Sequence, residues 1–145
     1  MKLAPFLAVG LSLVMTVRTP ATEKPNLVLI IADDCTYLDL GVYGGQAKTP
    51  ALDQLAGQGM QFSRCFQAAP MCSPTRHNIY TGIYPVKSGA WPNHTRVYPG
   101  TKSIAHYLRD AGYRVALSGK THIGPQASFP PSSIPVSFNP RTLIL

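Results

Sequence analysis

The stretch of sequence that decides the fold is Met71-Cys72-Ser73-Pro74-Thr75-Arg76-His77-Asn78-Ile79-Tyr80-Thr81-Gly82. Pro74 lacks a backbone N–H and has a fixed φ, so it predicts a helix of which it is the first residue. Cys72 then lies just outside the helix N-terminus, where free N–H groups favour negative charge. Arg76 follows about one turn later, and its planar guanidinium suits an oxyanion. The stretch therefore predicts an anion-binding helix start, and the alternative is a buried thiol beside a surface cation.

Upstream, a continuous apolar run over residues 26–32 ends at Asp33 and Asp34. The length of this run and its Val and Ile content predict a central strand of a parallel sheet, buried on both faces. The carboxyl end of such a strand is where ligands bind in open α/β sheets. Because unpaired buried carboxylates are costly, we expect a divalent cation there, and oxygen ligands suit Ca²⁺ or Mg²⁺. The alternative is that the two residues begin a turn or cap a helix.

Downstream, residues 102–112 read as an amphipathic helix that ends at Gly112, and residues 113–119 read as a second strand. Lys120 and His122 follow this strand directly. We expect both side chains at the same edge of the sheet as the two aspartates, because active-site groups collect at strand ends. The alternative is a pair of solvated loop residues.

The segments between these elements are less specific. Residues 35–45 predict a loop and residues 60–66 a short strand. Residues 49–56 predict a helix capped by Thr49, with Pro50 at its first position. The apolar face of that helix consists of Leu52, Leu55 and Ala56. Residues 83–96 predict a loop, in which Trp91 and His94 either line a sugar-binding rim or belong to a plain surface loop.

Composition limits the classes of protein to consider. The 145 residues suffice for one domain with a core, and 45% of them are hydrophobic. The net charge is +7, but the basic residues are scattered, so no nucleic-acid partner is expected. Of the three cysteines, Cys35 and Cys65 form a possible pair, although two free buried thiols are the preferred interpretation.

The two ends of the chain differ from its middle. Residues 1–21 read as a secretory signal peptide, with Lys2 before an apolar segment, so we expect an exported, periplasmic or secreted protein with no membrane contact after cleavage. An uncleaved anchor is the alternative. Residues 127–145 are rich in proline and have no helical or strand period. We interpret this tail as irregular and as out-of-frame or foreign sequence on a truncated protein.

Several of these segments resemble the sulfatase family. Its signature is Cys-x-Pro-Ser-Arg followed by Leu-Thr-Gly, and Thr75 here replaces Ser but keeps the hydroxyl. The Asp33-Asp34 pair resembles the first metal-binding segment of sulfatases, and residues 49–56 resemble a structural segment of theirs. Gly119-Lys120-Thr121-His122 resembles a second signature, with Val115 and Thr121 departing from the usual residues. The resemblance covers roughly residues 24–125.

The resemblance implies an α/β fold of the alkaline-phosphatase-like type, here partial, with a mostly parallel sheet flanked by helices. Residues 22–126 would be the N-terminal part of its catalytic domain. It further implies that a formylglycine-generating or sulfatase-maturing enzyme oxidises Cys72 to formylglycine. Asp33, Asp34 and the converted Cys72 would bind Ca²⁺, with Mg²⁺ as the other possibility. The remaining implied roles are catalysis by Cys72, Arg76, Lys120 and His122, and substrate binding by Lys120 and His94.

The implied activity is hydrolysis of sulfuric esters or sulfamates of sulfated glycans. Within the family, the sequence most resembles bacterial sulfatases of the heparan N-sulfatase type. Two alternatives stay open: a phosphonate or phosphate monoester hydrolase of the same superfamily, and a non-catalytic remnant. The later Asp-Asn pair that completes the metal shell in whole sulfatases does not occur in this sequence. We therefore expect weak metal binding and little or no turnover by this chain alone.

Overall fold

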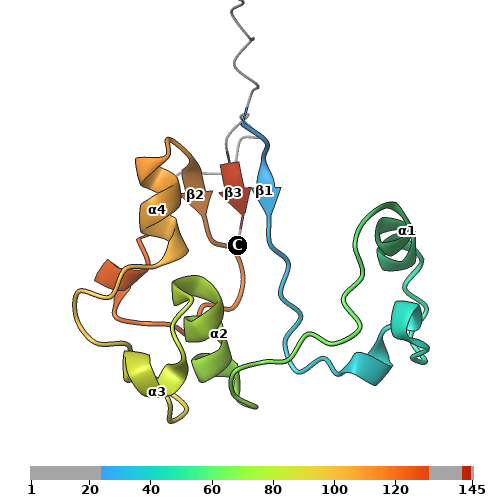
Figure 1. The fold of residues 1–145 in the computed structure, drawn as a ribbon, viewed down its shortest axis with the longest axis horizontal. Helices are drawn as coiled ribbons and strands as arrows, with labels where there is room; N and C mark the ends of the chain where they lie inside the picture. Colours follow the sequence, from blue (N-terminus) through green and yellow to red (C-terminus); the bar gives the residue numbers. More distant parts are fainter. Residues whose placement is uncertain (1–23, 131–141, 145) are drawn as a thin grey trace, which may run out of the picture.

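The computed structural model describes residues 24–130 and 142–144, so the predicted signal peptide and most of the tail lie outside the described residues. Three short strands form one parallel sheet in the order β1 (Leu27–Val28), β3 (Thr142–Ile144) and β2 (Arg114–Ala116). Leu143 pairs with Leu27 on one side and with Val115 on the other. The expected parallel sheet is therefore present, in a small form (Figure 1).

The strand predicted over residues 26–32 is shorter and more exposed than expected. Only Leu27–Val28 pairs as a strand, at one edge of the sheet. The Val28 and Ile30 side chains are 58% and 79% exposed. The prediction of a central strand buried on both faces is therefore wrong for this chain, because no described element covers these side chains. The apolar run continues beyond β1 as extended chain and leads to Asp33.

Helix α2 (Cys72–Thr81) carries the signature stretch. It begins at Cys72 and not at Pro74, so the thiol lies in the first turn of the helix instead of just outside it. Pro74 fits this first turn because N–H groups there have no partner within the helix. Gly82 ends the helix with φ of 69°, and its N–H donates to the Asn78 carbonyl at 2.8 Å. This left-handed cap is the reason for the Thr-Gly at the end of the stretch.

Two small apolar clusters hold the body of the chain together. Helix α4 (Ile104–Asp110) packs on β2, where Ala105 and Val115 are buried against Leu108. The second cluster lies against α2 and consists of buried side chains from four segments, Tyr80, Ala90, Val97 and Phe129. These clusters fix α2 next to the carboxyl end of β2, where Lys120 and His122 follow.

A separate arm extends from this body (Figure 1). It consists of two 3₁₀ turns, Tyr37–Asp39 and Gly41–Tyr43, and helix α1 (Pro50–Gln58). Pro50 is the first residue of α1, as predicted, but no residue of this helix is buried. The predicted strand over residues 60–66 is wrong, because this segment forms a turn and extended chain without strand pairing. Large exposed apolar side chains of the arm are Tyr37, Leu38, Leu52, Leu55, Met60 and Phe62.

Two further predictions need correction. The segment predicted as loop over residues 83–96 contains a short helix, α3 (Pro85–Ser88), which starts at a proline. The tail over residues 127–145, predicted to be irregular, continues the 3₁₀ turn Gln126–Ser128 and contributes strand β3. The segment Thr142–Ile144 lacks proline, so each of its residues keeps the N–H that pairing with β1 and β2 requires. Within residues 24–130 and 142–144, no helix has the length and hydropathy needed to cross a membrane.

Candidate active site

The first turn of α2 brings Cys72 against the loop that follows β2. The Cys72 Sγ atom lies 3.2 Å from Nδ1 of His122, although 50 positions separate the two residues. Cys72 is half-buried, and so is His122. The second sequence signature therefore meets the first one at hydrogen-bond distance. An imidazole at this distance is placed to hold or accept a proton of the residue at position 72.

Arg76 joins the same site to Asp33. It is 5% exposed, and its Nη2 atom lies 3.1 Å from Oδ1 of Asp33. Its Nη1 donates to the backbone carbonyl of Lys120 at 3.0 Å. The Lys120 ammonium binds the other carboxylate oxygen of Asp33. The Lys120 and Arg76 cations hold the pKa of Asp33 below its usual value, and the Asp33 carboxylate raises the pKa of Lys120.

His122 makes a second contact, to His94. Its Nε2 atom lies 2.8 Å from Nδ1 of His94, and the two ring centroids are 4.7 Å apart. Burial lowers the pKa of His122, and the nearby imidazole of His94 and the Lys120 and Arg76 cations lower it further. The lowered pKa favours the uncharged ring, which has one N–H and one bare nitrogen.

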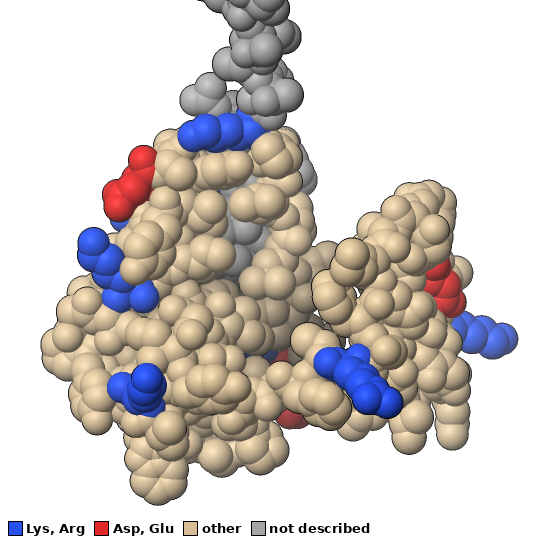
Figure 2. Space-filling model, in the orientation of Figure 1, with Lys and Arg blue, Asp and Glu red and all other residues tan. Residues whose placement is uncertain are grey.

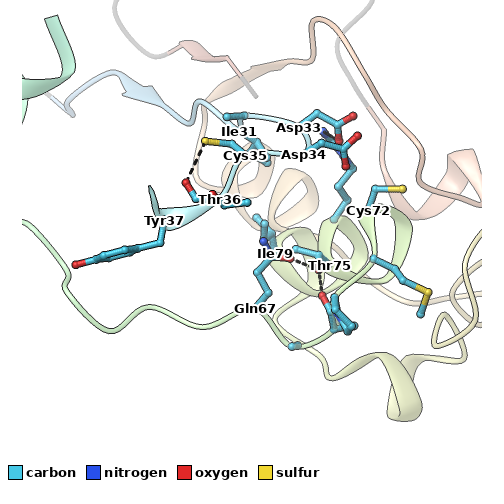
Figure 3. Close-up of a pocket in the computed structure, with 16 residues that line it drawn as sticks. Ile31, Asp33, Asp34, Cys35, Thr36, Tyr37, Gln67, Cys72, Thr75 and Ile79 are labelled. Carbon is cyan, nitrogen blue, oxygen red and sulfur yellow. Dashed lines mark hydrogen bonds and ion pairs between the residues drawn. The ribbon is translucent and has the colours of Figure 1, made fainter. Parts of the chain in front are cut away.

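Asp33 and Asp34 line a cavity of about 750 Å³ together with Cys72, Thr75 and Arg76. In Figure 3 the two carboxylates lie side by side, with the Cys72 sulfur at the same side of the cavity. Cys72 and Asp34 also contribute to the raised pKa of Lys120, so both lie near its ammonium group. Five of the residues predicted from the sequence are linked by direct contacts at or beside this cavity: Asp33 with Arg76 and Lys120, and Cys72 with His122.

The carboxylate oxygens of the site suit a cation that prefers oxygen ligands, but there are too few of them for a complete ligand set. Asp33 and Asp34 supply carboxylate oxygens, which Ca²⁺ and Mg²⁺ prefer. The part of the chain that the structure describes contains no group of three or more His, Cys, Asp or Glu side chains arranged to hold a metal ion. Asp33 is, in addition, already paired with two cationic side chains. A cation held here would share Asp33 with Arg76 and Lys120.

Two residues of the site were missed by the sequence analysis. His77 is fully buried, its Nδ1 donates to the Ser73 carbonyl at 2.8 Å, and its Nε2 accepts from the Gly124 N–H at 3.0 Å. Asn93 accepts from the Ser73 N–H at 3.4 Å through Oδ1, which also lies 3.7 Å from Cys72 Sγ. The spacing of Ser73 and His77 places them on one helix face and was a usable signal. Nothing in the sequence pointed to Asn93.

The other cysteines lie apart from this chemistry. All three cysteines are free thiols, so Cys35 and Cys65 do not form a pair. The expectation that both are buried is wrong, because Cys65 is exposed and Cys35 is half-buried at the edge of the cavity. Both belong to the chain segments around the exposed arm, which has no core of its own.

The charged side chains of the surface are dispersed. Figure 2 shows Lys and Arg as separate patches on the face in view, with apolar and neutral polar side chains between them. This distribution agrees with the scattered basic residues of the sequence. The only ion pairs among the described residues are those of Asp33 with Arg76 and Lys120. Among the described residues, charged side chains therefore meet only at Asp33.

Comparison with known proteins establishes the family. The sequence profile described as Sulfatase matches residues 25–132. The chain is 41% identical over 106 residues to the ulvan-active sulfatase of Formosa agariphila, an alignment that covers 72% of this chain and 21% of that protein. The chain therefore belongs to the sulfatase family. It spans about a fifth of the length of the curated relatives that it matches.

Solved structures agree in fold. A protein solved in complex with its substrate D-glucosamine-2-N,6-O-disulfate superposes with a TM-score of 0.64 at 30% identity, over 68% of this chain and 20% of that one. The phosphonate monoester hydrolase of Agrobacterium radiobacter superposes with a TM-score of 0.61 at 33% identity, over 65% and 19%. The expected partial alkaline-phosphatase-like fold is thereby confirmed.

Proposed function

We propose that residues 22–126 form the N-terminal part of the catalytic domain of a formylglycine-dependent sulfatase, which hydrolyses sulfuric esters or sulfamates. The observation that carries this proposal is the placement of Cys72 Sγ 3.2 Å from His122 Nδ1, at the start of the helix whose Arg76 binds Asp33. A nucleophile at residue 72, a neighbouring proton acceptor and fixed cations are the parts that acyl-type and sulfuryl-type displacement need.

Each side chain of the site has a proposed task. Cys72, once oxidised to formylglycine, would supply in its hydrated form the hydroxyl that attacks sulfur. Arg76 and Lys120 would offset negative charge on the oxygens of the sulfate group. His122, through Nδ1, would hold or accept the proton of a hydroxyl at residue 72. Since Arg76 is fixed by Asp33 and by the Lys120 carbonyl, its guanidinium needs no reorganisation when charge develops.

A divalent cation would complete this chemistry. Asp33, Asp34 and the converted side chain of Cys72 are the residues that would hold it, and Ca²⁺ or Mg²⁺ suits their oxygen atoms. When bound, such a cation supplies charge stabilisation and makes a nearby hydroxyl more acidic. With only two carboxylates from this chain, we propose weak binding and little or no turnover by these residues alone. A complete ligand set would need further protein donors.

The proposed substrate class is sulfated carbohydrate. It is supported by the ulvan-active relative and by the relative whose structure contains a glucosamine disulfate. Lys120 and the exposed His94 are the proposed substrate-contacting residues, since Lys120 binds Asp33, which lines the cavity, and His94 contacts His122 beside Cys72. Heparan-type N-sulfate groups remain the specific substrate that the sequence pattern favours.

Maturation and export are the two remaining parts of the proposal. Conversion of Cys72 requires a formylglycine-generating or sulfatase-maturing enzyme as partner. Such an enzyme needs Cys72 before the site has closed around it, because in the folded chain the thiol is half-buried against His122. Export to the periplasm or the medium is proposed from residues 1–21, which lie outside the described residues.

The test is mass spectrometry of the Cys72 peptide after co-expression with a sulfatase-maturing enzyme. The proposal expects a mass decrease that corresponds to exchange of the thiol for an aldehyde. The same peptide from Cys72→Ala is the control that cannot be converted. In Cys65→Ser, which replaces an exposed thiol, Cys72 should be converted normally. An unmodified thiol at Cys72 in the presence of an active maturing enzyme would contradict the proposal and favour a non-catalytic remnant.

The second candidate is a phosphonate or phosphate monoester hydrolase, favoured by the likeness to the Agrobacterium radiobacter enzyme. The converted chain should be compared on an aryl sulfate and an aryl phosphate, each with and without added Ca²⁺. Since little or no turnover is expected of these residues alone, any residual hydrolysis of the sulfate above that of Cys72→Ala supports the sulfatase. Hydrolysis confined to the phosphate supports the second candidate.

A further inference from the structure

The contact between His94 and His122 joins two segments that are far apart in the sequence. His122 is held between Cys72 Sγ, 3.2 Å from its Nδ1, and His94 Nδ1, 2.8 Å from its Nε2. Both ring nitrogens of His122 therefore have a partner, one at residue 72 and one at His94. A ring with a partner at each nitrogen cannot flip without losing both contacts, and its tautomer can change only if His94 and residue 72 exchange donor and acceptor roles with it.

The segment that carries His94 is itself anchored on both sides. On one side, Asn93 Oδ1 accepts from the Ser73 N–H in the first turn of α2. On the other side, the Val97 N–H donates to the Gly124 carbonyl at 3.0 Å, two residues after His122. His94 is thus tied to the element that bears Cys72 and to the loop that bears His122. The chain on either side of His94 is therefore anchored, although the His94 residue itself is exposed.

The backbone at both histidines is in the left-handed region. His94 has φ of 64° and His122 has φ of 50°. Residues other than glycine rarely adopt this conformation, and it persists where the surrounding structure holds it in place. Two such residues that meet through their rings indicate a pairing that the fold maintains at a local cost. Such costs are concentrated at functional sites.

We propose that His94 is a positioning residue for His122, which it holds as the Nε2–H tautomer with the bare Nδ1 directed at residue 72. This inference rests on the proposed function, in which Nδ1 of His122 handles a proton at that residue. With Nε2–H donated to His94 Nδ1, the uncharged His122 has only Nδ1 left as an acceptor. Without His94, Nε2 faces solvent, and water can stabilise either tautomer and either ring orientation.

The test is tautomer analysis of the full chain by long-range ¹H–¹⁵N correlation at pH 8, where imidazoles are uncharged. Two variants tolerate the left-handed backbone of residue 94: H94N keeps an acceptor near the position of Nδ1, and H94G removes it. We expect a preference on the order of tenfold for the Nε2–H form of His122 in the parent chain. H94N should retain it. H94G should lower it several-fold and lose the contacts between the His122 ring and the Cys72 β-protons.

His77 provides the internal control, since its buried ring must stay in the Nδ1–H form between Ser73 and Gly124. An unchanged His122 tautomer and an unchanged contact to Cys72 in H94G would overturn the proposal. If His77 no longer shows its Nδ1–H form in H94G, the variant has changed more than one contact, and the spectrum of the parent chain is used instead. A predominant Nδ1–H form of His122 in the parent chain overturns the proposal as well. None of these readings needs sulfatase activity. A failed conversion of Cys72 would contradict the proposed function and leave the tautomer result standing.

Discussion

Asp33 and Arg76 form an ion pair of 3.1 Å across 43 positions of sequence, between the end of the first apolar run and the second turn of α2. Arg76 is almost fully buried, whereas about a third of the Asp33 side chain is exposed. The pair therefore serves the fold and the site at once. It compensates a buried cation, and it brings the carboxylate next to Cys72.

The two adjacent aspartates should respond differently to removal of their charge. Asp33→Asn leaves the buried guanidinium of Arg76 without its anion, so we expect a clear loss of thermal stability. Asp34→Asn should leave stability nearly unchanged, because the Asp34 side chain makes no ion pair within the described residues and its left-handed φ of 51° suits asparagine. Thermal unfolding followed by circular dichroism measures both. Equal losses would contradict the assignment of the structural role to Asp33.

Calcium titration by calorimetry tests the proposed role of Asp33 and Asp34 as ligands of a cation. Both Asp33→Asn and Asp34→Asn should weaken the binding of Ca²⁺, because each removes one carboxylate ligand. The matched control is Asp53→Asn, on helix α1 of the arm and outside the cavity. Retained binding in Asp34→Asn would exclude this residue from the cation site.

His77 should be important for stability although it takes no part in the proposed chemistry. His77→Leu leaves the Ser73 carbonyl and the Gly124 N–H buried without their partner. We expect the free energy of unfolding to fall by about 1–3 kcal/mol, measured by urea denaturation. Ile79→Ala, at an exposed position of the same helix, is the control and should cost little. An equal effect of both substitutions would show that the His77 contacts are not stabilising.

Strand β3 should be needed for the sheet. Leu143 is the residue of β3 that pairs with both Leu27 and Val115, and Leu143→Pro removes its N–H and restricts its backbone. We expect loss of the cooperative unfolding transition or a midpoint lower by several degrees. Leu143→Val keeps the N–H and a side chain that favours strands, so it should behave like the parent chain. Identical melting curves of the parent, Leu143→Pro and Leu143→Val would mean that β3 does not contribute to stability.

The buried phenol of Tyr80 should make the free energy of unfolding depend on pH in the alkaline range. Burial raises the pKa of its phenol above 10.0, while Arg76 opposes this effect. Between the pKa values of the unfolded and the folded chain, the unfolded state has lost a proton that the folded state keeps. The free energy of unfolding therefore falls as the pH rises above 10, by at most about 1.4 kcal/mol per pH unit.

The comparison of Tyr80→Phe with Tyr84→Phe isolates this contribution. Tyr80→Phe should flatten the dependence of the urea midpoint between pH 9.5 and 11, because it removes the buried phenol. Tyr84 is 65% exposed, and its replacement should leave that dependence unchanged. Equal slopes in the parent chain and in Tyr80→Phe would contradict the prediction.

Much of the candidate site could be read from local patterns. The carboxyl end of an apolar run predicted where Asp33 and Asp34 lie, and the strand before Lys120 and His122 predicted their common edge. Proline and glycine marked both ends of α2 to within two residues. Such patterns are reliable because they reflect the conformational limits of single residues.

The errors of the sequence analysis concern contacts and not residue types. The run over residues 26–32 has the composition of a buried strand, but burial depends on what covers it, and no described element does. The tail has no strand period, yet Thr142–Ile144 pairs between β1 and β2 because partners are offered on both sides. Pairing in a sheet is decided by neighbours distant in sequence, which a local period does not contain.

The sequence by itself determined the chemistry available to this protein: a thiol at a helix start, two adjacent carboxylates, and an arginine, a lysine and a histidine at recognisable spacings. Only the tertiary structure decided which of these groups meet. Arg76 forms an ion pair with Asp33, Nδ1 of His122 contacts Cys72, and Nε2 of His122 contacts His94. The physical reason is that a hydrogen bond or ion pair depends on distances of a few ångströms between segments that the chain order leaves far apart.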